Sequence, residues 1–143
     1  MNERAILTGH CLCGAVKFTA TGVPHEVGAC HCTMCQRWTG GPAIAVKVAG
    51  MDFEGEEHLT RFRSSDWAER GFCSTCGSNL FYRIVGTDDY YVTAGVFDDP
   101  SGFWLASQIF IDEKPDYYDF ANETKMLTGE EVFEAVAKGK MPE

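Results

Sequence analysis

Seven cysteines in three tight clusters constrain this chain more than any other feature of its sequence. The clusters are Cys11-Leu-Cys13, Cys30-His-Cys32-Thr-Met-Cys35 and Cys73-Ser-Thr-Cys76. An odd number of cysteines leaves at least one unpaired in any disulfide framework. Cysteines one or two residues apart form disulfides only under strain, whereas they commonly share a metal ion. The pattern therefore predicts metal binding.

The number of cysteines matches one closed metal site and one open site. A structural zinc site has four protein ligands, whereas a catalytic site has three and leaves one position free. We therefore expect two zinc ions per chain. The structural ion would be held by Cys11, Cys13, Cys73 and Cys76, and the catalytic ion by Cys30, Cys32 and Cys35. A histidine, either His31 or His10, would close the second site if it supplied a fourth ligand.

Glycine follows each cysteine pair of the structural site, at Gly14 and Gly77. A residue without a side chain lets backbone N–H groups turn toward the thiolates with nothing in the way. We therefore expect the two glycines to shape the backbone around the structural ion.

Composition excludes several classes of protein. The chain has 143 residues, 45% of them hydrophobic and 18 aromatic (10 Phe, 5 Tyr and 3 Trp), which excludes intrinsic disorder. This length predicts a single domain over residues 1–143. The longest apolar run has four residues, and a transmembrane helix needs about 20. The N-terminus carries Glu3 and only three consecutive apolar residues, so we expect no secretory signal, no membrane span and a cytoplasmic protein.

The charge is acidic and unevenly distributed. Twelve bases and 21 acids give 12 − 21 = −9. Residues 1–50 contribute 4 − 2 = +2, and residues 51–143 contribute 8 − 19 = −11. An acidic chain without a basic cluster repels phosphate backbones, so we expect no nucleic-acid partner.

The sequence predicts a mostly β fold with one helix near the end. Alternating or β-branched and aromatic segments predict strands at 15–20, 43–48, 59–63, 79–85, 90–97 and 103–111. Thr128-Gly-Glu-Glu131 is a capping box, an apolar stripe follows, and Gly139 ends the predicted helix. Residues 32–38 fit one short helical turn. Short strands between turns are typical of a sandwich or a barrel-like fold.

The cysteine clusters belong to three longer motifs: Gly-His-Cys-Leu-Cys-Gly-Ala-Val-Lys-Phe at 9–18, Cys30-His-Cys-Thr-Met-Cys35 with Gly40, and Phe-Cys-Ser-Thr-Cys-Gly-Ser-Asn-Leu at 72–80. Together they resemble the glutathione-dependent formaldehyde-activating enzyme family, also called the CENP-V/GFA domain. The Phe-Asp-Asp-Pro turn at 97–100 fits as well. The resemblance covers about residues 8–112, most of the chain.

This resemblance implies an Mss4-like β-sandwich or tent of short antiparallel strands, with zinc-binding loops and one short C-terminal helix. It implies the same two zinc sites, at Cys11, Cys13, Cys73 and Cys76, and at Cys30, Cys32 and Cys35. The activity it implies is condensation of formaldehyde with glutathione, formally a carbon–sulfur lyase reaction in reverse. Gln108 stands where the resemblance leads us to expect a histidine, and the chain is shorter than the founding enzymes. Both departures bear on the substrate more than on the fold.

Chemistry at a three-thiolate zinc ion independently favours a thiol substrate. Three thiolates leave a net charge near −1, so the ion activates water poorly but can hold a substrate thiol as a thiolate. Arg37, two residues after Cys35, would offset added negative charge or bind a glutathione carboxylate through two hydrogen bonds. His31, between two expected ligands, is a candidate proton carrier unless its side chain points away.

Three functions remain as hypotheses from the sequence alone. The first is a zinc enzyme that makes or breaks a carbon–sulfur bond between a small thiol, expected to be glutathione, and an aldehyde. The second is a non-catalytic zinc module that binds a partner, because a fold does not fix a function. The third is a thiol redox protein in which one of Cys30, Cys32 and Cys35 is free and reactive.

Overall fold

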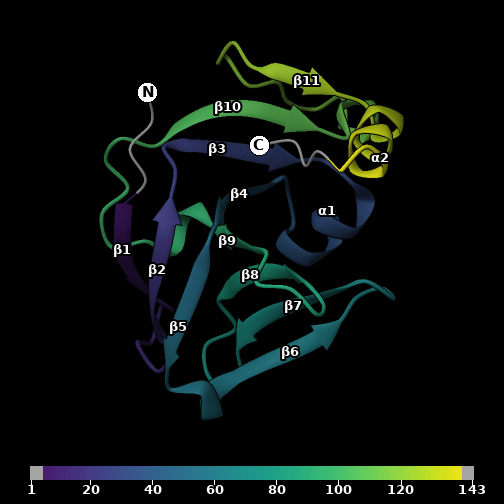
Figure 1. Cartoon of the computed structure of the whole chain (residues 1–143). Coiled ribbons are helices and arrows are strands. Elements are labelled where there is room, and N and C mark those ends of the chain that lie inside the picture. Colours follow the sequence, from purple (N-terminus) through teal and green to yellow (C-terminus); the bar gives the residue numbers. More distant parts are fainter. Residues whose placement is uncertain (1–4, 140–143) are drawn as a thin grey trace. The chain divides into compact units, whose positions relative to one another are not determined.

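A computed structural model describes residues 5–139 of the chain (Figure 1). Within these residues the chain forms two compact units, one of residues 5–25 and 45–103 and the other of residues 26–44 and 104–139. We call them the first and the second unit. The single domain expected over residues 1–143 stays a prediction. Residues 1–4, which belong to the segment where a secretory signal would lie, are outside the described residues.

The first unit contains two antiparallel sheets. One has the strand order β1 (Ala5–His10), β2 (Lys17–Val23) and β5 (Gly50–Glu54). The other has the order β4 (Ala43–Val48), β9 (Tyr90–Thr93), β8 (Asn79–Ile84), β7 (Ala68–Cys73) and β6 (Leu59–Arg63). The first two residues of β4 belong to the second unit. Two short 3-10 helices complete the first unit, η1 (Glu56–His58) and η2 (Ala94–Val96).

Aromatic side chains fill the core of the first unit. Phe81 is fully buried, and its ring centroid lies 5.0 Å from that of Tyr90 and 5.5 Å from that of Phe53. Gly71 lies against the Phe81 ring, where an added Cβ would come within 2.2 Å of a ring atom. Such close packing explains why a glycine stands within strand β7, because only a residue without a side chain leaves room for the ring.

The second unit contains a small parallel sheet with helices at the ends of its strands. Its strand order is β11 (Lys125–Leu127), β10 (Trp104–Ile109) and β3 (Glu26–Cys30) (Figure 1). Helix α1 (Thr33–Thr39) follows β3, the 3-10 helix η3 (Ile111–Glu113) follows β10, and α2 (Gly129–Ala137) follows β11. The register puts Ile109 opposite Cys30. The C-terminal end of β10 therefore lies beside the predicted cysteine triplet.

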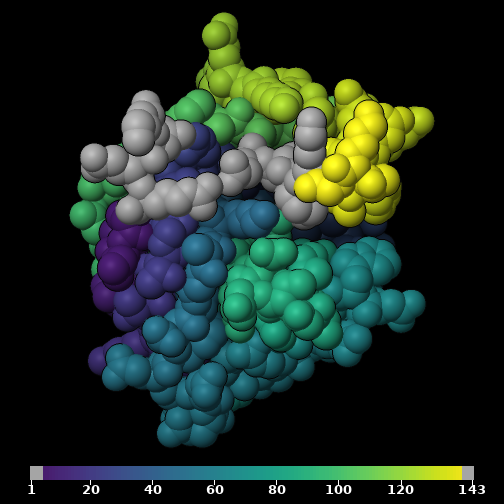
Figure 2. All heavy atoms as spheres, in the orientation of Figure 1, coloured from purple at the N-terminus to yellow at the C-terminus, as the bar shows by residue number. Residues whose placement is uncertain are grey.

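The predicted β class and the C-terminal helix are confirmed. Thr128 and Glu131 form both hydrogen bonds of the capping box, and Gly139 follows α2 at φ 73°. Helix α2, yellow in Figure 2, stands at the surface. Its Phe133 side chain is exposed. Helix α1 lies within one residue of the short helical segment expected over residues 32–38. The second unit departs from an antiparallel arrangement, since both of its strand pairs, β10–β11 and β3–β10, are parallel. Within residues 5–139, no helix is long and apolar enough to cross a membrane.

Candidate metal centres

The first group of sulfur atoms joins two distant loops of the first unit. The Sγ atoms of Cys11, Cys13, Cys73 and Cys76 all lie within 4.8 Å of one another. Cys13 Sγ lies 3.6 Å from Cys11 Sγ and 3.8 Å from Cys73 Sγ. Four sulfur atoms at about 2.3 Å from one zinc ion in a tetrahedron would lie about 3.8 Å apart. All four thiols are free of disulfide bonds, so the group fits one tetrahedral metal ion.

In both loops the glycine that follows the second cysteine closes a turn, which spans three residues in the first loop and four in the second. Gly14 N–H donates to Cys11 O at 3.1 Å, and Gly77 N–H donates to Cys73 O at 2.8 Å. The two glycines have φ values of 81° and 79°, and an added Cβ would meet no atom within 4 Å at either position. Glycine is therefore required for its left-handed backbone conformation. The sequence correctly indicated a role for glycine, but the reason is the backbone angle and not an obstructing side chain.

Ser78 connects the two loops, and the sequence analysis did not single it out. Its Oγ accepts a hydrogen bond from Leu12 N–H at 2.9 Å and lies 3.2 Å from Cys76 Sγ. Backbone N–H groups also reach sulfur, from Val16 to Cys11 at 3.3 Å and from Cys76 to Cys73 at 3.5 Å. The signal for Ser78 was its position directly after the Cys-x-x-Cys-Gly motif, because hydrogen-bonding residues next to metal ligands orient them.

Electrostatics within the four-cysteine group oppose simultaneous ionisation in the absence of a cation. The Ser78 hydroxyl and N–H groups lower the pKa of Cys76 to about 5. The N–H of Ala15 favours the Cys13 thiolate, but desolvation and the other three sulfur atoms outweigh it and raise the pKa of Cys13 to about 12. A divalent cation removes this conflict, because its charge favours the thiolate form of every ligand.

The second group of sulfur atoms belongs to one short segment of the second unit. The Sγ atoms of Cys30, Cys32 and Cys35 lie within 4.8 Å of one another, and no histidine or carboxylate of the described residues joins them. Cys30 ends β3, Cys32 is the N-cap of α1, and Cys35 lies in the helix. Cys32 Sγ accepts a hydrogen bond from Cys35 N–H at 3.4 Å. Cys35 is buried and the other two are partly exposed, so three donors converge at a place that solvent reaches.

His31 is buried between two triplet cysteines and points into a hydrogen-bonded cluster. Its Nδ1 lies 2.7 Å from the Tyr118 hydroxyl and its Nε2 lies 2.8 Å from Gln108 Oε1. The ring has no exposed surface. With both nitrogen atoms engaged, His31 does not offer a lone pair to the triplet, and it does not reach solvent as a proton carrier would. Both roles considered for it from the sequence are therefore not supported by its geometry.

Two other residues singled out from the sequence lie at the surface. Arg37 is exposed in the last turn of α1. It is two residues from buried Cys35, and residues two apart on a helix do not face each other. His10 belongs to the first unit, where its Nδ1 lies 2.7 Å from Asp98 Oδ1, and Asp98 Oδ2 accepts a hydrogen bond from Thr8 Oγ1 at 2.8 Å. His10 therefore connects β1 to the 97–100 turn.

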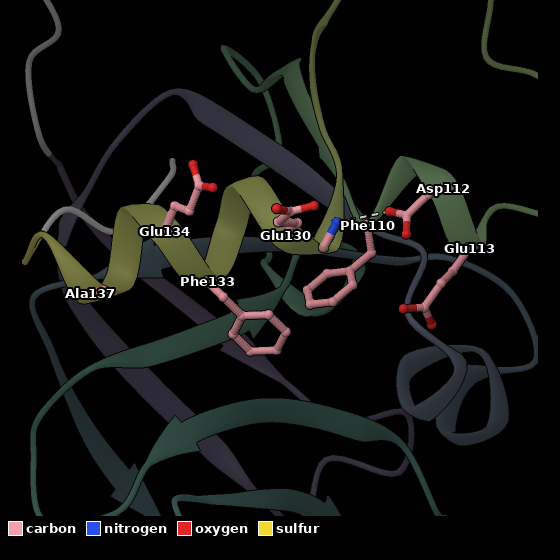
Figure 3. Close-up of a pocket in the computed structure, with 8 residues that line it drawn as sticks. Phe110, Asp112, Glu113, Glu130, Phe133, Glu134 and Ala137 are labelled. Carbon is pink, nitrogen blue, oxygen red and sulfur yellow. Dashed lines mark hydrogen bonds between the residues drawn. The ribbon is translucent and has the colours of Figure 1, made fainter.

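Two of the cavities among the described residues bear on the candidate sites. One, of about 400 Å³, borders the four-cysteine group and is lined in part by His10, Cys11 and Ser78. The other, of about 640 Å³, lies in the second unit beside α2, with no cysteine in its lining. Figure 3 shows the Phe110 and Phe133 rings on one side of α2 and the Glu130 and Glu134 side chains on the other. Because these carboxylates point away from the rings, they do not form one polar binding surface with them.

Comparison with known proteins identifies the family. The model of the family "Glutathione-dependent formaldehyde-activating enzyme" matches residues 6–113. This chain belongs to that family. The match includes all seven cysteines, whereas Tyr118 and α2 lie beyond it. The resemblance to this family was therefore assigned correctly from the sequence.

Two relatives and one solved structure resemble this chain, each over a different share of its length. A protein of Schizosaccharomyces pombe named "Uncharacterized lyase" is 35% identical over 132 residues, which cover 91% of this chain and 96% of the relative. A Halomonas elongata protein named "Putative glutathione-dependent formaldehyde-activating enzyme" is 31% identical over 86 residues, 53% of this chain and 55% of the relative. The crystal structure of a Rhodobacter sphaeroides protein is similar with a TM-score of 0.55 and 25% identity, covering 64% of this chain and 88% of that one.

Proposed function

We propose that this chain is an enzyme that forms or breaks the carbon–sulfur bond between glutathione, or a similar small thiol, and formaldehyde or a related aldehyde. The observation that carries the proposal is the cysteine triplet, whose three Sγ atoms lie within 4.8 Å of one another without a fourth donor among the described residues. Membership of the glutathione-dependent formaldehyde-activating enzyme family supports the substrate class.

The two sulfur groups have different donor sets, and this difference supports different roles. Cys11, Cys13, Cys73 and Cys76 would provide the four thiolates of a closed structural zinc site. Cys30, Cys32 and Cys35 provide three and would leave one ligand position free. A zinc ion held there would supply a positive centre that keeps a substrate thiol in its thiolate form.

The triplet cysteines would hold the metal ion and so orient the substrate thiol. The reaction itself needs no oxidant or reductant. The thiol sulfur bonds to the aldehyde carbon, the carbon–oxygen π bond breaks, and the thiol proton ends on the new hydroxyl group. Cys30 and Cys32 are partly exposed, so a substrate could approach their side of the triplet, while Cys35 is buried. Holding thiolate and aldehyde together removes the entropic cost of their encounter. Arg37 is the residue we propose for a glutathione carboxylate.

The test compares Cys32→Ser with the wild-type protein. Serine is also a favourable N-cap, so the substitution keeps the hydrogen bond from Cys35 N–H and removes only the sulfur donor. We expect glutathione-dependent turnover of formaldehyde, followed by NMR exchange spectroscopy, to fall at least about a hundredfold toward the uncatalysed rate. Met34→Ser is the matched control, because Met34 is an exposed sulfur residue of the same helix.

A thermal-shift experiment separates the enzyme from a non-catalytic module and from a redox protein. Glutathione should raise the melting temperature of the wild-type protein, because a ligand that binds only the folded state stabilises it. S-methylglutathione, which has no thiol, should raise it much less. Turnover equal to the uncatalysed rate, together with no glutathione-dependent shift, would refute the proposal. Three freely titrating thiols at residues 30, 32 and 35 in the native protein would instead favour thiol redox chemistry.

A further inference from the structure

A buried chain of hydrogen bonds runs through the residue that separates Cys30 from Cys32. The His31 ring is completely buried, with Tyr118 Oη 2.7 Å from Nδ1 and Gln108 Oε1 2.8 Å from Nε2. Gln108 is also buried, and its Nε2 donates to Thr124 Oγ1 at 2.9 Å. The chain therefore links the cysteine loop to two positions of the segment between η3 and β11.

These partners determine where the protons lie. The amide of Gln108 donates to Thr124, so its oxygen faces His31 and can only accept. His31 Nε2 must then carry a hydrogen atom, and in the tautomer with a hydrogen on that nitrogen alone, Nδ1 accepts from the Tyr118 hydroxyl. Burial raises the pKa of the Tyr118 hydroxyl, which keeps its proton in place. Every polar atom of the ring is satisfied.

The backbone of His31 is held as firmly as its side chain. Its N–H donates to Ile109 O at 3.1 Å, and its carbonyl oxygen accepts from Gln36 Nε2 at 2.6 Å. Four hydrogen bonds thus fix one residue whose two peptide bonds lead directly to Cys30 and Cys32. Because the buried His31 ring cannot reach a substrate, these hydrogen bonds can affect the site only through the neighbouring residues, Cys30 and Cys32.

We propose that His31 is a positioning residue for the cysteine triplet, and that the Tyr118–His31–Gln108–Thr124 chain fixes the relative positions of the Cys30 and Cys32 sulfur atoms. Binding sites need their donors held within about 0.5 Å of the productive geometry. The two residues between β3 and α1, His31 and Cys32, do not provide that precision alone. The side chain of His31 provides it by anchoring the backbone between Cys30 and Cys32. This inference rests on the proposed function only in taking the triplet as metal ligands.

The test removes one hydroxyl group and measures metal release. Tyr118→Phe keeps the ring but leaves His31 Nδ1 without its donor, and Tyr117→Phe is the matched control because Tyr117 is the adjacent, exposed tyrosine. Transfer of zinc from the purified two-zinc protein to a coloured chelator should show one phase for each site. We expect Tyr118→Phe to accelerate the triplet phase about three- to tenfold, the effect of one lost hydrogen bond. The four-cysteine phase serves as an internal control and should not change.

Two results overturn the inference. The first is an equal rate of zinc release from the triplet in wild type and in Tyr118→Phe, even if the variant melts at a lower temperature. A merely structural role of the hydrogen bond predicts that combination. The second is an equal acceleration of zinc release by Tyr117→Phe and Tyr118→Phe, because it would indicate a general destabilisation of the segment that contains both tyrosines.

A wild-type chain that holds only one zinc ion would refute the proposed function. In that case a second measurement still tests the positioning role of His31. In ¹⁵N NMR spectra the His31 ring should show the Nε2–H tautomer. Tyr118→Phe, unlike Tyr117→Phe, should shift the Cβ resonances of Cys30 and Cys32. Unchanged cysteine resonances would overturn the positioning role independently of any metal.

Discussion

Cys13 Sγ lies 3.8 Å from Cys73 Sγ, although the two residues are 60 positions apart in the sequence. A metal ion bound there would hold the loop between β1 and β2 against the hairpin between β7 and β8. The cysteine triplet is different, because Cys30 and Cys35 are separated by only four residues. An ion that joins distant segments contributes its binding energy to folding, whereas an ion bound by a local segment contributes much less.

We therefore predict opposite effects of two cysteine substitutions. The wild-type protein, purified without chelator, should contain two zinc ions per chain. Cys73→Ser should lose one ion and unfold the first unit, because it removes a ligand that joins distant loops. Cys32→Ser should also lose one ion but keep its far-UV circular dichroism. Metal analysis by mass spectrometry and thermal melts would check both variants.

One zinc ion per wild-type chain, with three thiols titrating freely in the native state, would contradict the division into four ligands and three. A Cys73→Ser variant that melts at the wild-type temperature would contradict the folding role of the first group. Chelator treatment of the wild-type protein gives an independent check, since prolonged removal of zinc should reproduce the Cys73→Ser melt.

The sequence predicted the two sulfur groups because cysteine spacing is a local signal. It also predicted strands β4 and β6 with their observed bounds, because both are short segments rich in β-branched or aromatic residues. It missed β7, in which Glu69, Arg70 and Gly71 interrupt the apolar pattern. That strand forms because Arg70 stacks on Tyr82 and Gly71 leaves room for Phe81, and both contacts depend on the neighbouring strand.

The partners of His31 could not be predicted for a similar reason. Gln108 and Tyr118 are 77 and 87 positions away, and no local pattern connects a buried histidine with residues at such distances. At Gln108 the sequence departs from the histidine that the family resemblance leads us to expect, and this departure by itself bears only on the substrate. In the structure this glutamine instead accepts a hydrogen bond from His31.

Gly77→Ala should destabilise the four-cysteine group through the backbone alone. Gly77 has φ 79°, where an L-residue costs about 1–2 kcal/mol, and an added methyl group would meet no atom within 4 Å. We expect the free energy of unfolding to fall by about that amount and zinc release from this group to accelerate. Gly95→Ala is the control, because an added Cβ there also meets no atom within 4 Å and φ is not positive. Equal stability of the two variants in urea titrations would show that backbone conformation is not the reason for Gly77.

Glu69→Gln should reveal a pH-dependent contribution to stability in the sheet of β6, β7 and β8. Burial would raise the pKa of Glu69, but Arg61, at 2.6 Å, and Arg83, at 3.3 Å, outweigh it and hold the pKa below its usual value. A carboxyl whose folded pKa is lowered stabilises the protein above its unfolded pKa, about 4.3. That contribution disappears as the pH falls through the folded pKa.

The measurement is the difference in unfolding free energy between wild type and Glu69→Gln at several pH values. We expect about 1 kcal/mol near pH 6 to 7, shrinking toward zero below about pH 4. Glu57→Gln, which removes an exposed glutamate of η1, controls for the loss of one charge and for metal release in acid. A difference for Glu69→Gln that stays constant across this range would contradict the ion-pair explanation.

Arg37 offers the sharpest test of how a glutathione carboxylate would be held. Its guanidinium group can bind a carboxylate through two parallel hydrogen bonds, which the ammonium group of lysine cannot do. It also stands in the last turn of α1, where any positive charge stabilises the helix. Arg37→Lys keeps the helix contribution and removes the paired hydrogen bonds, whereas Arg37→Gln removes both.

If Arg37 binds substrate, both variants should raise KM for glutathione about three- to tenfold with little change in kcat, and only Arg37→Gln should lower the melting temperature. Arg63→Gln, at an exposed arginine of β6, is the control for lost positive charge. A KM that stays at the wild-type value in Arg37→Lys and Arg37→Gln would leave Arg37 with the helix role alone.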